Sequence, residues 1–181
     1  MSKPGERGFS IVEATIAVSL LAIGVAGLAQ LTVATGRANT AARRATIAQQ
    51  AASERMEQLR ALAWTSDGGV VPVSDWSSDL TTTPASTGGV GLASAPATLA
   101  TNTPGFCDFL DANGRWLAAG TRVPVGAEWV RRWSVGAVDS LADTLILHVD
   151  VIPATAARAG LASASGTNGA WLVAMRTRRT R

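Results

Sequence analysis

The feature that most constrains this sequence is a run of 23 residues, Ala14 to Gly36, that contains no charged side chain. As an α-helix rising ~1.5 Å per residue, the run would be about 35 Å long, enough to cross a ~30 Å hydrocarbon core. One carboxylate, Glu13, stands immediately before it, and a short polar segment carrying Lys3 and Arg7 comes first. We therefore expect a membrane-spanning helix, with the short basic segment on the cytoplasmic side.

The composition excludes several classes of site. The chain has 181 residues, the length of one domain with an appendage, and its single Cys and single His exclude an intrachain disulfide and a multi-histidine metal site. Residues 1–8 carry two basic and one acidic side chain, so without them the net charge falls from +3 to +2. So small a charge argues weakly for nucleic-acid binding.

Two general explanations of the apolar run fit it poorly. A secretory signal peptide has a shorter apolar region, followed by a cleavage site of small residues. An ordinary membrane anchor gives no reason for Glu13, because a carboxylate within the bilayer costs about 2.5–3.5 kcal/mol and usually has a partner.

A third explanation comes from the string Gly8-Phe9-Ser10-Ile11-Val12-Glu13. It resembles the processing motif of type IV pilins and type II secretion pseudopilins. The resemblance implies that a prepilin peptidase cleaves between Gly8 and Phe9 and methylates Phe9, while the apolar segment stays on the mature protein. It also implies a bacterial inner-membrane protein that crosses the lipid once, with its head in the periplasm, and then joins a pilus or pseudopilus.

The position of Glu13 fits assembly through the helix. Cleavage would leave a positive amine on Phe9, and residues four apart share one face of a helix. Glu13 can then pair with its own terminus or with that of a neighbouring subunit, which offsets part of the desolvation cost and fixes the axial register between subunits. We expect Glu13 to be the residue on which assembly depends.

The helix is expected to continue as an amphipathic segment over residues 37–64, since no Pro or Gly lies between Arg37 and Trp64. Small or apolar residues recur at a spacing of three to four on one face, namely Ala41, Ala45, Ala48, Ala52, Met56, Leu59 and Ala63. Polar residues are expected on the opposite face, namely Arg43, Arg44, Gln50, Glu54, Glu57 and Arg60.

The predicted fold class is α+β, a long N-terminal helix packed on a small antiparallel β-sheet head. The expected segments are a leader (1–8), a membrane half of the helix (9–36), its amphipathic half (37–64) and a head (65–181). Within the head, residues 65–105 are rich in Ser, Thr, Gly and Pro and predict loops with short edge strands. Three strands are predicted: 129–135 is rich in β-forming residues, 144–152 alternates apolar and polar residues, and 170–176 is expected as the last strand.

Three groups in the head could carry chemistry. Asp108, Asp111 and Asn113 offer oxygen ligands near Gly114, as calcium loops do, although a hairpin turn at Asn113-Gly114 explains them equally well. His148 and Asp150 could form an acid–base pair, but a solvated strand face is expected instead, and Cys107 has no second His to act with. The C-terminal arginines could contact DNA phosphates, but a solvated terminus or a salt-bridging edge against another subunit is expected instead; they are Arg176, Arg178, Arg179 and Arg181.

The resemblance indicates a minor type IV pilin or pseudopilin rather than an enzyme, with no cofactor unless calcium binds. The Ile11–Ala14 run and the Met56–Arg60 segment further resemble minor pilins of the pilus-modification (V-type) group and pseudopilin I. The implied partners are a prepilin peptidase, other pilin subunits and inner-membrane lipid. The alternative function is a DNA-binding minor pilin of a DNA-uptake system.

Overall fold

The computed structural model describes residues 10–62, 64–66, 72–73, 91–92, 98–138, 141–160 and 169–177. Gly8 and Phe9, the predicted processing residues, lie outside this set. The chain divides into two compact units, Met1–Ala42 and Arg43–Arg181. Each unit is described below by itself.

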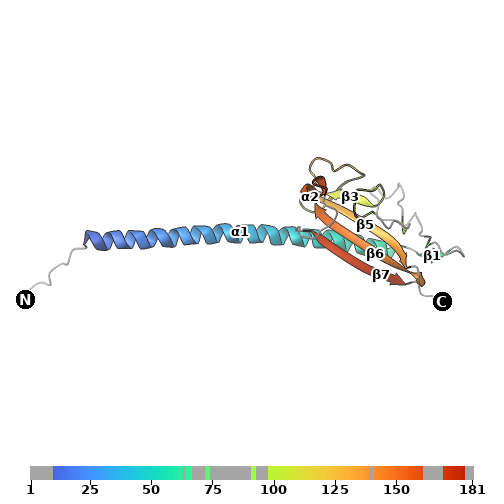
Figure 1. Ribbon diagram of the computed structural model, residues 1–181, viewed down its shortest axis with the longest axis horizontal. Coiled ribbons are helices and arrows are strands. Elements are labelled where there is room, and N and C mark those ends of the chain that lie inside the picture. The colour runs from blue at the N-terminus through green and yellow to red at the C-terminus, as the bar shows by residue number, and fades with distance from the viewer. Residues whose placement is uncertain are drawn as a thin grey trace, which may run out of the picture. The chain divides into compact units, whose positions relative to one another are not determined.

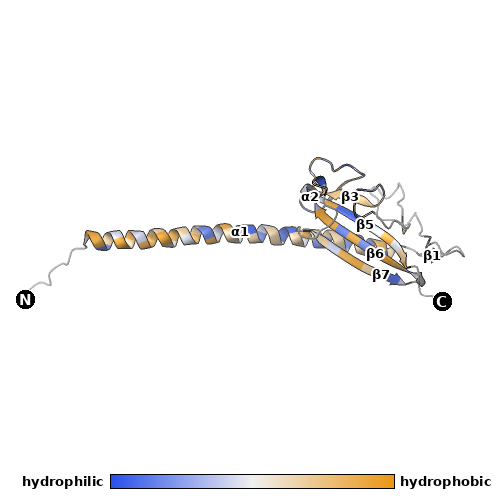
Figure 2. Ribbon diagram, viewed as in Figure 1, coloured by the Kyte–Doolittle hydropathy of each residue, from blue (hydrophilic) through white to orange (hydrophobic). Residues whose placement is uncertain are grey.

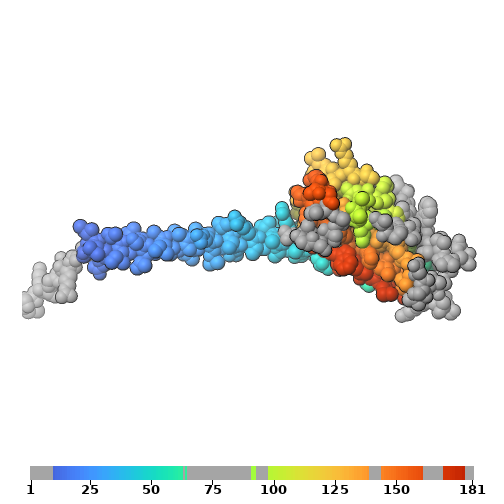
Figure 3. Space-filling model, in the orientation of Figure 1, coloured from blue at the N-terminus to red at the C-terminus, as the bar shows by residue number. Residues whose placement is uncertain are grey.

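In the first unit, helix α1 (Ile11–Ala61) begins after Ser10, whose side-chain oxygen accepts a hydrogen bond from the Val12 amide at 3.3 Å. This contact caps one of the unpaired amides of the first turn. Every residue from Ser10 to Thr40 is exposed (Figure 3), and apolar residues dominate this stretch of the helix (Figure 2). The helix is long and apolar enough to cross a membrane, as its sequence predicts.

The second unit contains a five-stranded antiparallel sheet in the order β4-β3-β5-β6-β7 (Figure 1). Its strands are β3 (Cys107–Leu110), β4 (Trp116–Ala119), β5 (Trp129–Val138), β6 (Leu141–Pro153) and β7 (Ala170–Thr177). Two short strands, β1 (Thr65–Ser66) and β2 (Pro72–Val73), pair with each other. The α+β class is confirmed.

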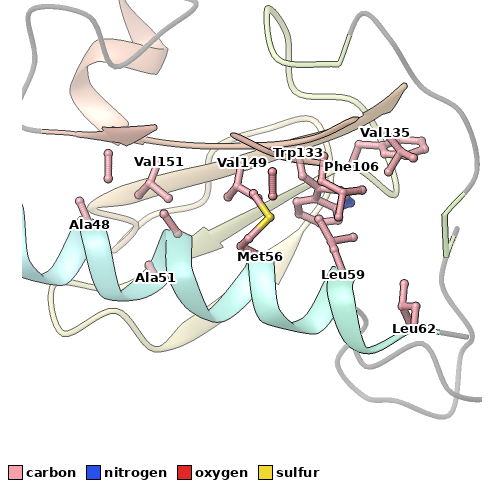
Figure 4. Close-up of a cluster of buried hydrophobic side chains, with 14 of the residues drawn as sticks. Ala48, Ala51, Met56, Leu59, Leu62, Phe106, Trp133, Val135, Val149 and Val151 are labelled. Carbon is pink, nitrogen blue, oxygen red and sulfur yellow. The ribbon is translucent and has the colours of Figure 1, made fainter. Parts of the chain in front are cut away.

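The last turns of α1 pack on one face of this sheet (Figure 4). The helix contributes a stripe of side chains at three- to four-residue spacing, which includes Ala48, Ala52, Met56 and Leu59 as predicted. The sheet contributes alternate residues of its central strands, because successive side chains of a strand point to opposite faces. These residues are Trp129, Trp133 and Val135 of β5 and Leu145, Leu147, Val149 and Val151 of β6.

The opposite face of the sheet carries a second apolar cluster at one end. Phe109 and Val130 pack there with Ile152 and with Ala154, the first residue of the short helix α2 (Ala154–Arg158). Further along the same face, Trp171, Val173 and Met175 of the edge strand β7 remain exposed. The central strand β5 is therefore buried on both sides from Trp129 to Val135.

Several expectations about element boundaries are wrong. Helix α1 ends at Ala61 rather than at residue 64, and Ala45 is exposed although it shares the predicted apolar spacing. The sheet has five strands rather than three, because β3 and β4 are only four residues long and carry too little alternation to be recognised. Most of 65–105 lies outside the described residues.

Candidate functional site

Glu13 lies in the first turn of α1, with its side chain exposed. Among the described residues its carboxylate has no hydrogen-bond or ion-pair partner. The helix N-terminus favours a nearby negative charge because the amide groups of the first turn point toward it. The geometry is that of a carboxylate at the start of an apolar helix, available to a cation that the described part of the chain does not supply.

A buried ion cluster, Arg55–Asp108–Arg131, joins α1 to the sheet in the second unit. Arg131 donates to both carboxylate oxygens of Asp108, from Nε at 3.0 Å and from Nη2 at 2.8 Å. Arg55, from the helix, donates to the same carboxylate. The exposed fractions of Arg55, Asp108 and Arg131 are 2%, 1% and 3%, so all three charges are removed from water.

The two arginines of this cluster have further partners. Arg131 also donates to the backbone carbonyl of Ala51 at 3.0 Å, and its Nη1 lies 3.6 Å from the carboxylate of Glu54 at the cluster's exposed rim. The guanidinium of Arg55 lies 4.2 Å from the centre of the Trp133 ring, a cation–π contact. Two arginines thus meet two carboxylates, and the cluster fixes the position of the helix along the sheet.

The calcium interpretation of Asp108, Asp111 and Asn113 finds little support in this geometry. The Asp108 carboxylate is occupied by two arginines, whereas Asp111 Oδ1 accepts the backbone amides of Asn113 and Arg115 at 2.8 and 2.9 Å. Gly114 has φ = +79°, a value suited to the turn that joins β3 to β4. The hairpin alternative is therefore confirmed. Within the described ranges, no cluster of three or more His, Cys, Asp or Glu side chains could hold a metal ion.

The expectation of a solvated strand face at His148 and Asp150 is wrong for Asp150, whose exposed fraction is 1%. Asp150 lies opposite Arg132 in the register between β5 and β6. Arg132 donates to Asn102 Oδ1 and to the Leu99 carbonyl, both at 2.9 Å, so segment 98–102 covers this end of the strand. Here a buried carboxylate faces a buried arginine, which is a structural arrangement rather than an acid–base pair.

Cys107 lies on the same side of the sheet and is fully buried. Its burial, with a smaller contribution from the neighbouring charge of Asp108, raises the pKa of the thiol from its ordinary 9.0 to about 12. A thiol with so high a pKa is protonated near neutral pH and is a poor nucleophile. Cys107 therefore acts as a small apolar side chain.

Arg176 has a specific structural role that its place in the basic tail does not reveal. Its guanidinium donates to the backbone carbonyls of Leu59 at 3.1 Å and Leu62 at 2.6 Å, at the C-terminal end of α1. It also lies 5.8 Å from the centre of the Trp64 ring, and burial lowers its pKa. Arg176 caps the helix from β7, while Arg178, Arg179 and Arg181 lie outside the described residues.

Sequence reasoning missed Arg55 and Arg131, although a signal for each was present. Arg131 alternates with Trp129 and Trp133, so it must share their buried face. Arg55 lies three residues after Ala52 and four before Leu59, which places it on the buried stripe of the helix. Two arginines on two facing apolar surfaces predict a shared carboxylate between them.

No protein-family model, curated protein or solved structure matches this chain.

Proposed function

We propose that this protein is a minor type IV pilin or type II secretion pseudopilin that acts structurally, by joining a helical filament through α1. The observation that carries the proposal is Glu13, an unpaired carboxylate in the first turn of an exposed apolar helix. It stands four residues after Phe9 and five after Gly8, the spacing of the prepilin motif. A free amine on Phe9 would provide the cation that Glu13 lacks.

The division of labour along α1 supports the same proposal. From Ser10 to Thr40 every side chain is exposed, and most of the large ones are aliphatic. From Ala48 to Leu59 the helix instead buries its apolar stripe against the sheet. The first stretch is thus available to lipid or to other helices, which is what an assembling subunit held first in a membrane requires.

The alternative of DNA binding is less favoured because Arg176, the first arginine of the basic tail, donates to backbone carbonyls of α1. Its charge is directed at the end of the helix rather than toward a phosphate. Catalysis is also less favoured, because Asp150 and Arg132 are buried together and the thiol of Cys107 has a raised pKa.

The first experiment is mass spectrometry of the N-terminus after expression in a bacterium that has a prepilin peptidase. We expect a chain that begins at Phe9 and carries one methyl group. A chain that retains residues 1–8 in the presence of an active peptidase would contradict the proposal.

The second experiment replaces Glu13. We expect Glu13→Ala to be processed and to fractionate with the membrane but to be absent from sheared filaments. Glu57→Ala is the matched control, because Glu57 is an exposed carboxylate on the same helix whose only described ion pair is with Arg60. Normal incorporation of Glu13→Ala would remove the main support for the proposal.

A further inference from the structure

Gln30 is the one polar side chain of the charge-free run Ala14–Gly36 whose hydrogen bonds the helix itself does not satisfy. The run contains four hydroxyls, and each donates to the carbonyl four residues earlier. The four bonds are Thr15 to Ile11, Ser19 to Thr15, Thr32 to Leu28 and Thr35 to Leu31, at 2.8–2.9 Å. Gln30 is exposed, and its carboxamide has no partner among the described residues.

Such a group needs a partner in a membrane. Gln30 is six residues before Gly36, roughly 9 Å along the helix axis, so it lies inside the hydrocarbon layer when the run spans a bilayer. Water is scarce there, and a carboxamide moved into hydrocarbon without a hydrogen bond costs several kcal/mol. Polar side chains at such positions form hydrogen bonds between helices.

We propose that Gln30 pairs with Gln30 of a second copy of this chain while both are in the membrane. The inference rests on the membrane placement within the proposed function. Two copies inserted by the same route are parallel, so their Gln30 side chains lie at the same depth. A carboxamide has a donor and an acceptor side by side, so two of them satisfy each other.

The surroundings of Gln30 permit a close approach of two helices. Ile23, Ala26, Gln30 and Val33 follow a spacing of three and four, which brings them to one seam of a parallel helix pair. A shallow hollow on this side of α1 is lined by Ala29, Gln30, Val33, Ala34 and Arg37. Gln30 and Glu13 are roughly 100° apart around the helix, so the two contacts use different faces.

Cysteine cross-linking of the full-length chain in bacterial membranes tests the pairing. Ala26→Cys places a thiol on the Gln30 seam, and Leu28→Cys places one nearly opposite Gln30 on the same helix turn. The unsubstituted chain measures the background from Cys107, which is buried and carries a thiol of raised pKa. On oxidation we expect a covalent dimer from Ala26→Cys and little from Leu28→Cys.

A second substitution then isolates the carboxamide. Adding Gln30→Leu to Ala26→Cys should reduce the dimer yield about threefold to thirtyfold, the range expected for one interhelical hydrogen bond. Adding Gln30→Asn should restore part of the yield, because it keeps the amide. Carbonate extraction of each variant reports whether the chain is still in the membrane.

Four results would overturn the inference. Equal dimer yields from Ala26→Cys and Leu28→Cys would show that no face is preferred, and an unchanged yield with Gln30→Leu would show that the amide is not involved. A cross-linked product with another protein instead of a dimer would identify a different occupant. Release of the unsubstituted chain by carbonate would contradict the membrane placement itself, and with it both proposals.

Discussion

Removing the negative charge from the buried Arg55–Asp108–Arg131 cluster should be the most destabilising single change in the second unit. Asp108→Asn keeps the size of the side chain but leaves two buried guanidinium groups, at exposed fractions of 2% and 3%, without their shared carboxylate. An amide cannot accept on both sides, so the paired bonds from Arg131 at 3.0 and 2.8 Å cannot both be kept. Breaking a buried ion pair from one side costs about 3–5 kcal/mol.

The loss is measurable as a fall in melting temperature. For a unit of this size, 3–5 kcal/mol corresponds to roughly 10–20 °C. The assay is thermal unfolding of the full-length protein in detergent, followed by tryptophan fluorescence, since Trp133 contacts Arg55. Glu57→Gln is the matched control, because its pair with Arg60 is exposed and should be worth less than about 1 kcal/mol.

A double-mutant cycle separates the ion cluster from general damage to the core. Arg55→Met should cost less in the Asp108→Asn background than in the unsubstituted chain, because its partner is already lost there. We expect a coupling of about 0.5–3 kcal/mol, the range for residues in contact. If Asp108→Asn lowers stability no more than Glu57→Gln does, or if the coupling is zero, the reasoning is wrong.

Three further changes should have smaller and distinct effects. Arg176→Met should lower stability by about 1 kcal/mol and speed amide exchange in the last turn of α1, because the carbonyls of Leu59 and Leu62 lose their donor. Unchanged amide exchange would contradict the capping role. The pKa of the Cys107 thiol is about 12 in the folded state, above its ordinary 9.0. The contribution of this thiol to the free energy of unfolding is therefore complete below pH 9 and is lost as pH rises toward 12. Between about pH 8 and pH 11, the denaturant midpoint should therefore fall further for the unsubstituted chain than for Cys107→Ala. Equal falls in the two proteins would refute this. Gly114→Ala should lower stability by about 1 kcal/mol or more in a thermal melt, because φ is +79° and the new Cβ would lie 3.3 Å from Ile47 Cγ2. The control Gly36→Ala should not lower stability, because Gly36 is in a helix and a Cβ there would have no neighbour within 4 Å.

The sequence predicts those parts of the fold that depend on periodicity. The apolar run and the stripe through Ala48, Ala52, Met56 and Leu59 extend over many residues, so the helix and its buried face are recognisable. The strands β5, β6 and β7 are each eight residues or longer, so their β-forming or alternating residues are recognisable as well. Strands β3 and β4 are not recognisable in this way, because four residues carry no such periodicity and β3 is a strand through its pairing with β4 and β5.

The polar residues were harder to assign because their partners are distant in the sequence. In the sequence, Asp108 stands close to Asp111 and Asn113 and resembles a calcium ligand in a loop. Its actual partners, Arg55 and Arg131, lie 53 and 23 residues away. The sequence does not reveal the capping role of Arg176, because its acceptors are 117 and 114 residues earlier. The role of Glu13 stays a prediction, and it depends only on neighbouring residues in the sequence.

The contact between Arg176 and the end of α1 has a consequence for the order of events during synthesis. The ribosome makes α1 first and β7 more than a hundred residues later, so the amphipathic stretch of the helix leaves the ribosome long before its cap exists. Until β7 is added, the edge of β6 also lacks its neighbour. The apolar start of the chain can be delivered to a bilayer during this interval, whereas the head must wait. If α1 spans a membrane as proposed, a chain that stops before β7 would be held there with an incomplete sheet, and we expect it to be degraded more readily than the full chain.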